Sequence, residues 1–204
     1  LALHALIAAC GGEPLDLGIA PDSEDALKAM AEGARGADML VTTGGASVGD
    51  HDLVQKVLGD MGLKVDFWRI AMRPGKPLMF GRIGNTQMMG LPGNPVSALV
   101  CATIFLWPAL NAMLGLDGAG LNEQQAILSA PLPENDERED YLRASLSQTG
   151  NGVLQATAFS KQDSSVFSGL AQADCLIIRA PFAPAAKKGD SVRIITLAGG
   201  SQSI

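Results

Sequence analysis

The stretch MLVTTGGASVGDHD, residues 39–52, predicts a buried β-strand that ends in a glycine-rich turn. Its first three residues are apolar, and the two threonines that follow favour a pleated sheet. Gly44, Gly45, Ser47 and Gly49 come next, before a helical pattern that begins at Leu53. Glycine tolerates positive φ, so the N–H groups of such a turn can point toward one anion. The positive end of the following helix dipole would favour the same anion.

This turn has two interpretations on sequence alone. Glycine-rich strand-to-helix turns occur in many α/β proteins for geometric reasons, and a single motif of this kind is weak support for a ligand. The acidic residues Asp50 and Asp52 follow the turn directly, where they could hold a cation or orient a nucleophile. The choice between a structural turn and a phosphate-type site stays open at this point.

Composition narrows the class of protein. The chain has 204 residues, of which 47% are hydrophobic and 18% charged, so it has the composition of a globular protein. Its formal net charge of -6 argues against nucleic acid or an anionic membrane as a partner. The longest apolar run, residues 96–110, is too short and interrupted for a membrane span. Three separated cysteines and two histidines provide neither a disulfide framework nor a zinc site, which fits a reducing cytoplasm.

The first part of the chain alternates between helical and strand patterns. Asp22 stands at the expected N-cap of one helix, with Asp25 three residues later. Gly84-Asn85 predicts a two-residue hairpin turn. The alternation predicts a mostly parallel sheet with crossover helices. The expected helices are 1–10, 23–34, 53–61 and 96–114, the last one buried and bent at Pro108, and the expected strands are 14–19, 39–43, 65–71, 78–83 and 86–91.

Three cations lie close together in the segment RIAMRPGKPLMF. Arg69, Arg73 and Lys76 surround a Pro74-Gly75 turn, and the prolines of this segment prevent regular strand pairing. The segment is either a solvated loop or a clamp for an oxyanion or phosphate.

A second strand-to-helix junction lies at LPGNPVSALV. Asn94 stands at an N-cap and Pro95 at the first helical position. Because Pro92 and Pro95 lack an N–H, an anion here would be held by Gly93, Asn94 and the first-turn amides of residues 96 and 97. The alternative is an ordinary capped helix start. If both turns bind, they and the cations should meet one anionic ligand at the carboxyl ends of the strands.

The composition changes after Gly115. Five short runs, AILSAPL, YLRASL, VLQATAF, DCLIIRA and SVRIITL, are separated by Pro, Gly, Asp and Asn. They predict a small all-β domain, a barrel or a sandwich. Arg143 and the serines Ser164, Ser165 and Ser168 either face a neighbouring cleft or are simply exposed.

Together, TTGGASVGDHD, RPGKP and GLPGNPVSALV, in this order and followed by a β domain, resemble the MoeA/gephyrin family of molybdopterin molybdenumtransferases. The resemblance implies an α/β domain of the MoCF/MogA type over residues 1–116, lacking its first strand, and a C-terminal β domain over residues 117–204. It implies insertion of molybdate into adenylylated molybdopterin with release of AMP, using Mg²⁺, in a cytoplasmic homodimer. A molybdopterin adenylyltransferase and a non-catalytic gephyrin-like scaffold are the alternatives.

The same resemblance assigns roles to individual residues. It implies Asp52, Asp22 and Lys76 as catalytic residues, with Asp52 as the Mg²⁺ ligand. Relatives often carry lysine where Arg69 and Arg73 stand. An acidic G-D-E-type loop of the family is absent, so we expect these 204 residues alone to be impaired in the full reaction. The implied ligand contacts are Gly44, Gly45, Ser47, Gly49, Arg69, Arg73, Lys76, Pro92, Gly93, Asn94, Pro95, Ser97, Arg143, Ser164 and Ser168.

Overall fold

The computed structural model describes residues 1–44, 53–116, 121–164 and 167–197. The chain forms two compact units, one of Leu1–Ile70 with Gly75–Ala119 and one of Ala71–Pro74 with Gly120–Ile204. The division after residue 119 lies close to the expected boundary at 116. The short segment 71–74 was not anticipated as part of the second unit.

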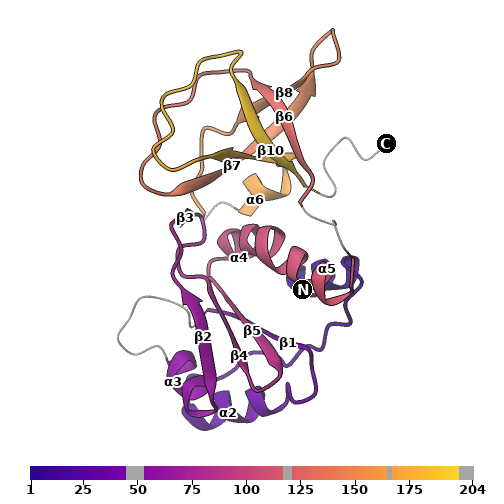
Figure 1. Ribbon diagram of the computed structural model, residues 1–204, viewed down its shortest axis with the longest axis vertical. Coiled ribbons are helices and arrows are strands. Elements are labelled where there is room, and N and C mark those ends of the chain that lie inside the picture. Colours follow the sequence, from indigo (N-terminus) through magenta and orange to yellow (C-terminus); the bar gives the residue numbers. More distant parts are fainter. Residues whose placement is uncertain (45–52, 117–120, 165–166, 198–204) are drawn as a thin grey trace. The chain divides into compact units, whose positions relative to one another are not determined.

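The first unit is a four-stranded sheet flanked by helices (Figure 1). The strand order is β1-β5-β4-β2. In the figure, α2 and α3 lie on one side of the sheet, and α4 and α5 lie on the other. The elements are α1 (Ala2–Ala9), α2 (Glu24–Glu32), β1 (Met39–Thr43), α3 (Leu53–Asp60), β2 (Leu63–Trp68), β4 (Met79–Ile83), β5 (Thr86–Leu91), α4 (Pro95–Cys101), the π-helix η1 (Ala102–Leu106) and α5 (Trp107–Met113).

The α/β class is confirmed, but the sheet is mixed rather than mostly parallel. Among the described strands, β1 and β5 pair parallel, whereas β5 with β4 and β4 with β2 pair antiparallel. The reason is local. The expected hairpin forms, with Gly84 at φ 59°, and the loop between β2 and β4 also reverses the chain. Two chain reversals in succession leave one parallel pairing in this sheet.

Two local expectations were wrong. Residues 14–19 form no strand, because the Gly18 N–H bonds the Asp16 carboxylate at 2.8 Å and Gly18 takes φ 83°. The N-cap of α2 is Ser23 rather than Asp22. The Ser23 hydroxyl accepts the N–H of Ala26 at 3.3 Å. Asp22 lies one residue outside the helix and is exposed, so capping does not account for it.

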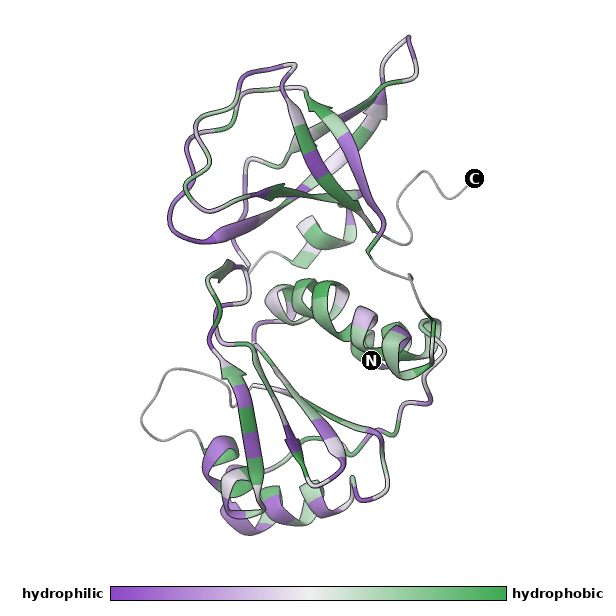
Figure 2. Ribbon diagram, viewed as in Figure 1, coloured by the Kyte–Doolittle hydropathy of each residue, from purple (hydrophilic) through white to green (hydrophobic). Residues whose placement is uncertain are grey.

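The core of the first unit lies between the sheet and the pair α2 and α3. Leu40 and Met88, which are register partners in β1 and β5, are buried there with Leu58 of α3. Because side chains alternate along a strand, Met89 and Leu91 belong to the opposite face, where α4 contacts β5. Figure 2 shows α4 apolar almost throughout, whereas α2 and α3 carry both hydrophilic and hydrophobic faces. The amphipathic helices α2 and α3 therefore pack against the sheet with their apolar faces.

The expected helix 96–114 exists but changes character along its length. It passes from α4 through the π-helix η1 into α5, which carries Pro108. Pro108 has no N–H for an i to i−4 bond, and a π-turn just before it takes up the misfit. Residues 95–113 are long and apolar enough to cross a bilayer, yet half of the run is buried inside the protein. Burial is strongest in α4 and η1, and α5 is mostly partly exposed, so the expectation of burial throughout was too broad.

The second unit is a closed β-barrel, as expected. Its sheet has the order β3-β7-β8-β6-β10-β9, and an additional pairing of β7 with β9 closes a ring. Leu128, Ala144 and Ile177 are among the side chains buried in its core. Closure leaves no open edge within the ring. The elements are β3 (Met72–Arg73), β6 (Glu123–Leu128), β7 (Glu139–Gln148), β8 (Leu154–Ala158), α6 (Phe167–Ala171), β9 (Cys175–Arg179) and β10 (Ser191–Thr196).

Strand β3 joins this sheet from a distant part of the chain. It pairs parallel with β7, with Met72 opposite Glu139 and Arg73 opposite Asp140. The Arg73 guanidinium bonds Asp136 at 3.0 Å and also bonds the buried carboxylate of Asp140. Arg138 bonds Asp136 as well, at 2.8 Å. An ionic cluster thus fixes the segment 71–74 to the barrel.

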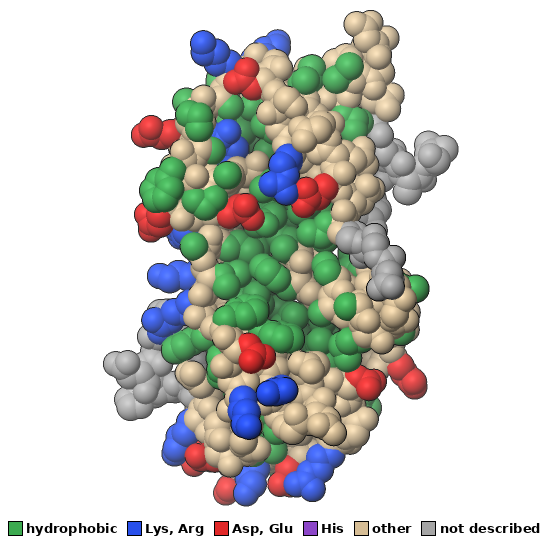
Figure 3. Space-filling view, viewed as in Figure 1, with side chains coloured by type: hydrophobic (Ala, Val, Ile, Leu, Met, Phe, Trp, Pro, Cys, Tyr) green, Lys and Arg blue, Asp and Glu red, His purple; other side chains and the backbone are tan. Residues whose placement is uncertain are grey.

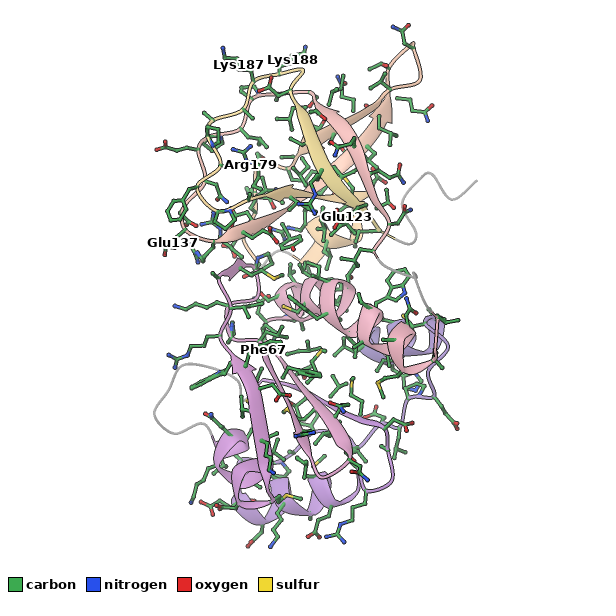
Figure 4. The ribbon with its side chains drawn as sticks, in the orientation of Figure 1. Phe67, Glu123, Glu137, Arg179, Lys187 and Lys188 are labelled. Atoms are coloured by element: carbon green, nitrogen blue, oxygen red, sulfur yellow. The ribbon has the colours of Figure 1, made fainter. Side chains whose placement is uncertain are left out.

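A second arginine ties the barrel loops together. Arg179 is 7% exposed, and its Nη2 donates to the carbonyls of Pro133 at 3.0 Å and Pro184 at 2.5 Å. In Figure 4, Arg179 lies among these loops, whereas Lys187 and Lys188 point away from the barrel. Carbonyl oxygens therefore satisfy this buried cation.

We expect Gly81→Ala to destabilise the first unit. A Cβ at this position would lie 2.4 Å from the carbonyl oxygen of Lys64, where the register of β2 shifts. The contact involves backbone on both sides, so relief requires a strand movement that costs about 1–3 kcal/mol. Gly59→Ala in α3 is the matched control, since its Cβ meets nothing within 4 Å and alanine favours helix by up to about 1 kcal/mol. Urea unfolding of both variants measures the difference, and equal midpoints would contradict the close approach of Gly81 to the Lys64 carbonyl.

The ionic cluster predicts a pH dependence. Hydrogen bonds from Arg138, and then the charge of Arg73, lower the pKa of Asp136 from 3.8 to about 2. The ionised form therefore stabilises the folded state above the ordinary pKa, and this contribution disappears as the pH falls from about 4 to about 2.

We expect Asp136→Asn to lower the melting temperature at pH 6 and to converge with the unsubstituted protein near pH 2. Glu137→Gln, at an exposed neighbouring position (Figure 4), is the control. A difference that stayed constant across this range would show that the Asp136 charge is not the source.

Candidate functional site

The carboxyl ends of β1 and β5 lie side by side. Thr43 is the register partner of Leu91, and the Gly44 N–H donates to the Leu91 carbonyl at 3.1 Å, one residue beyond the end of β1. The chain then leaves the sheet at Gly44 with φ 81°. The two glycine-containing turns predicted from the sequence therefore begin at the same edge of the sheet.

These turns are in direct contact where they begin. A Cβ on Gly93 would lie 3.2 Å from Cα of Gly44 and 3.7 Å from its nitrogen. Two backbones approach this closely only where side chains are absent. Packing thus explains Gly93, and positive φ explains Gly44, in both cases independently of any ligand. Gly45, Ser47, Gly49 and Asp52 lie outside the described residues, and their predicted roles stay predictions.

The second turn is capped as expected, and the cap uses donors that we had assigned to an anion. The Asn94 carbonyl Oδ1 accepts the N–H groups of Val96 at 3.1 Å and Ser97 at 3.2 Å. The Ser97 hydroxyl also bonds this oxygen, at 3.4 Å. Pro95 occupies the first helical position, as predicted. Because the side chain of Asn94 already bonds these two amides, an anion held by them would have to displace it, and the expectation that they hold one stays a prediction.

The cationic segment divides between the two units. Arg69 and Lys76 belong to the first unit, where the Arg69 N–H bonds the Leu78 carbonyl and the Ile70 N–H bonds the Lys76 carbonyl, both at 3.0 Å. The Arg69 guanidinium lies 4.1 Å from the centre of the Trp68 ring, a cation–π contact. Arg69 has φ 66°, which is uncommon for residues other than glycine. Main-chain hydrogen bonds therefore fix the loop that carries Lys76, whose side chain is exposed.

Arg73 differs from the other two cations. It belongs to the second unit, and two carboxylates offset its charge. The spacing of the three cations along the sequence does not distinguish one from another. It therefore could not predict that Arg73 would pair with Asp136 and Asp140. Arg73 serves first as the anchor of β3.

Arg143 is buried within the barrel unit, neither exposed nor solvated. It is 2% exposed, and its Nη2 donates to the Asp163 carbonyl at 3.1 Å. Burial lowers the pKa of Arg143, and the Asp163 charge opposes that shift. Ser164 follows Asp163 and is half-buried, whereas Ser168 lies in α6 and is exposed. The structure thus joins Arg143 to the segment that carries Ser164. Gln162, which also bonds Arg143, was missed because an isolated glutamine in a loop has no sequence signature.

A hollow of about 390 Å³ lies at the opposite end of the first sheet. Lys28 and Arg35 line it together with Glu32 and Asp60. Figure 3 shows basic and acidic side chains interspersed at this end of the unit. The opposite charges balance, so this hollow does not select anions. Among the residues that the structure describes, no group of three or more His, Cys, Asp and Glu side chains is arranged to hold a metal ion.

The chain thus combines an α/β unit, whose two turns begin at the carboxyl ends of a parallel strand pair, with a closed β-barrel unit, which defines a two-domain α/β-plus-barrel class of protein. Residues 2–112 match the family described as "Probable molybdopterin binding domain", and residues 125–197 match the "MoeA C-terminal region (domain IV)". The chain therefore belongs to the MoeA/gephyrin family.

Relatives and solved structures agree with this assignment. The chain is 35% identical over 168 residues to the molybdopterin molybdenumtransferase of Haemophilus influenzae, covering 81% of this chain and 41% of that protein. It is 29% identical to the Bacillus subtilis protein of the same name, and the match covers 96% of this chain and 45% of that protein. The crystal structure of the molybdopterin biosynthesis MoeA protein from Pyrococcus horikoshii superposes with a TM-score of 0.77 at 28% sequence identity. The match covers 98% of this chain and 48% of that protein. The chain thus spans less than half the length of these relatives.

The contact between the two turns yields a prediction. We expect Gly93→Ala to destabilise the first unit by about 1–3 kcal/mol, because the added methyl group meets the backbone of Gly44 at 3.2 Å. Gly59→Ala is the control for a glycine outside this contact, since its Cβ meets nothing within 4 Å and its φ is not positive. Chemical unfolding followed by circular dichroism measures both. A Gly93 variant no less stable than the wild type would refute the close approach.

Proposed function

We propose that this chain is part of a molybdopterin molybdenumtransferase, an enzyme of molybdenum cofactor biosynthesis that inserts molybdate into adenylylated molybdopterin and releases AMP. The observation that carries the proposal is the meeting of the Gly44 and Gly93 turns at the carboxyl edge of a sheet that matches a molybdopterin-binding family. The barrel that follows argues against a stand-alone molybdopterin adenylyltransferase, because residues 125–197 match the MoeA C-terminal region.

The chemistry of the substrates fits the residues available. Molybdate and a phosphoanhydride are both anions, so the site must offset their repulsion with donors and positive charge. Lys76 provides a point charge on a loop held by main-chain hydrogen bonds, and Arg69 lies at the start of the same loop. The main chain of Gly93 contributes the close approach that a side chain would prevent. Arg73 contributes less, because Asp136 and Asp140 already offset its charge.

Magnesium forms a further part of the proposal. Bound Mg²⁺ would polarise a phosphoryl oxygen. Asp52 is the proposed ligand, and it lies outside the residues whose geometry is described. Asp22 is exposed and does not cap α2, so its carboxylate has no capping role.

The remaining proposals concern the setting of the enzyme. We propose a homodimer in the cytoplasm, without nucleic acid or membrane as a partner. The formal charge of -6 supports the last point. No described feature favours a scaffold role over catalysis.

Lys76 tests the proposed reaction. In the full-length protein, we expect Lys76→Ala to lower molybdenum insertion and AMP release about 10- to 100-fold, the range expected when one charge-assisted hydrogen bond of roughly 1.5–3 kcal/mol is lost. Lys64→Ala removes an exposed lysine from β2 and should leave both rates unchanged. Product analysis for molybdenum and AMP decides the matter. Normal turnover in the Lys76 variant would exclude the proposed contact, and an unsubstituted protein without turnover would exclude the function.

A further inference from the structure

A phenylalanine occupies a turn position of the barrel unit that favours glycine. Residues 180–183, APFA, form a turn after β9, in which the Ala183 N–H donates to the Ala180 carbonyl at 3.1 Å. Proline at the second position and a positive φ at the third are features of a type II turn, whose third residue is usually glycine. Phe182 has φ 56° at that position. A side chain there strains the backbone, because its Cβ crowds the following carbonyl oxygen.

Burial does not compensate for this strain. Phe182 is 74% exposed, more than any other phenylalanine of the chain, so its ring gains little from packing within the protein. The neighbouring Pro181 and Pro184 are exposed as well. Backbone outliers of this kind persist where the surrounding structure imposes them, and they cluster at functional sites. Exposed aromatic side chains are also frequent anchors of protein interfaces. The strain and the exposure of Phe182 therefore point to a contact outside the chain.

The surrounding structure does impose the turn. The Asn135 N–H donates to the Ala183 carbonyl at 2.9 Å, and the Phe182 N–H donates to the Asp136 carbonyl at 2.7 Å. Nδ2 of Asn135 also donates to the Ala180 carbonyl, at 2.9 Å. The buried arginine at the end of β9 bonds the carbonyls of the same two loops from inside the barrel. These hydrogen bonds hold the backbone of the turn in place and leave the ring in solvent.

Two exposed carboxylates accompany the ring. Residues 133–137 and 180–184, the Phe182 platform, are joined by the hydrogen bonds above into one surface. Glu134 and Glu137 are exposed on either side of the two residues that bond the turn. Asp136 is paired with arginines, whereas Glu134 and Glu137 take no part in the salt bridges formed by the described residues. The platform therefore combines an apolar centre with negative charge.

This combination selects the kind of partner. In Figure 4, Glu137 lies at the lower end of the barrel loops, and Lys187 and Lys188 lie at the upper end, away from it. Two copies of the platform would bring like charges together, and the net charge of -6 opposes an anionic membrane or nucleic acid. Arginine or lysine on a partner would instead pair with the carboxylates, and a guanidinium can also stack on an aromatic ring.

We propose that the Phe182 platform docks a protein partner through a basic segment that also carries apolar side chains. Phe182 is the apolar anchor, and Glu134 and Glu137 provide the complementary charge. Glycine at position 182 would relieve the strain but would leave the platform without its anchor. The docking role is independent of the proposed molybdenum transfer, because no residue of the platform is assigned to that reaction.

The variant Phe182→Gly separates stability from docking in the full-length protein. Glycine adopts φ 56° without strain, so the melting temperature should stay unchanged or rise by up to about 4 °C. Loss of a packed phenylalanine would instead lower the melting temperature. A fall would therefore show that the ring packs within the protein, and it would overturn the proposal.

The binding probe is a short fluorescein-labelled peptide that alternates arginine with leucine, and its control has serine in place of leucine. By fluorescence polarisation, we expect the arginine–leucine peptide to bind at least about tenfold more tightly than the control, a difference of about 1.4 kcal/mol. Phe182→Gly should remove this preference. Glu134→Gln combined with Glu137→Gln should weaken the binding of both peptides. Phe167→Ala removes another exposed phenylalanine of the same unit and should change neither affinity.

The outcomes separate the hypotheses. Absent binding of the arginine–leucine peptide, equal binding of both peptides, or a preference that survives in Phe182→Gly would overturn the docking role. Unchanged affinity in the double glutamine variant would overturn the basic character of the partner. Dimerisation that is lost in Phe182→Gly would assign the ring to a second copy of the chain instead. Molybdenum insertion should be equal in Phe182→Gly and the unsubstituted protein. If neither transfers molybdenum, the proposed function fails while the docking result stands.

Discussion

The first unit is organised around the contact of two backbones. The parallel pairing of β1 with β5 continues through the hydrogen bond from Gly44 to Leu91, and it brings Gly93 within 3.2 Å of Gly44 as measured from an added Cβ. The contact leaves little room for a side chain at Gly93, and the φ of 81° favours glycine at position 44. Both turns leave the sheet from these two residues. Whatever the turns bind, their common origin is a packing constraint.

Arginine holds the second unit together, by two means. Arg73 anchors β3 through carboxylates, and Arg179 collects main-chain carbonyls from separate loops. Arg143 combines a carbonyl with the Gln162 amide. A guanidinium presents five donors in a fixed plane, so one side chain can join several acceptors that the strands leave unpaired. Several arginines of the barrel therefore have a structural role. The number of positively charged residues in the sequence is for this reason a poor guide to where an anion binds.

Much of the fold followed from local patterns. The hairpin at Gly84, the Asn94 cap and the runs of the barrel are encoded by the backbone preferences of residues close in sequence. Where the expected local structure did not form, a nearby side chain had bonded a main-chain N–H group instead. Asp16 turned an expected strand into a loop, and Ser23 took the cap assigned to Asp22. The strand pairing is mixed rather than mostly parallel because the hairpin itself reverses the chain, which the alternation of helices and strands does not reveal.

The sequence by itself determined the class of fold, the two domains, the family resemblance and the positions of the two glycine turns, because these depend on periodicity and on backbone conformations that few residues allow. Only the tertiary structure decided how the charges are used. Arg73 proved to be paired with Asp136 and Asp140, Arg143 proved to be buried against Gln162, and the amides after Asn94 proved to be occupied. Pairing of this kind depends on contacts between residues far apart in the chain, and spacing along a sequence carries no record of them.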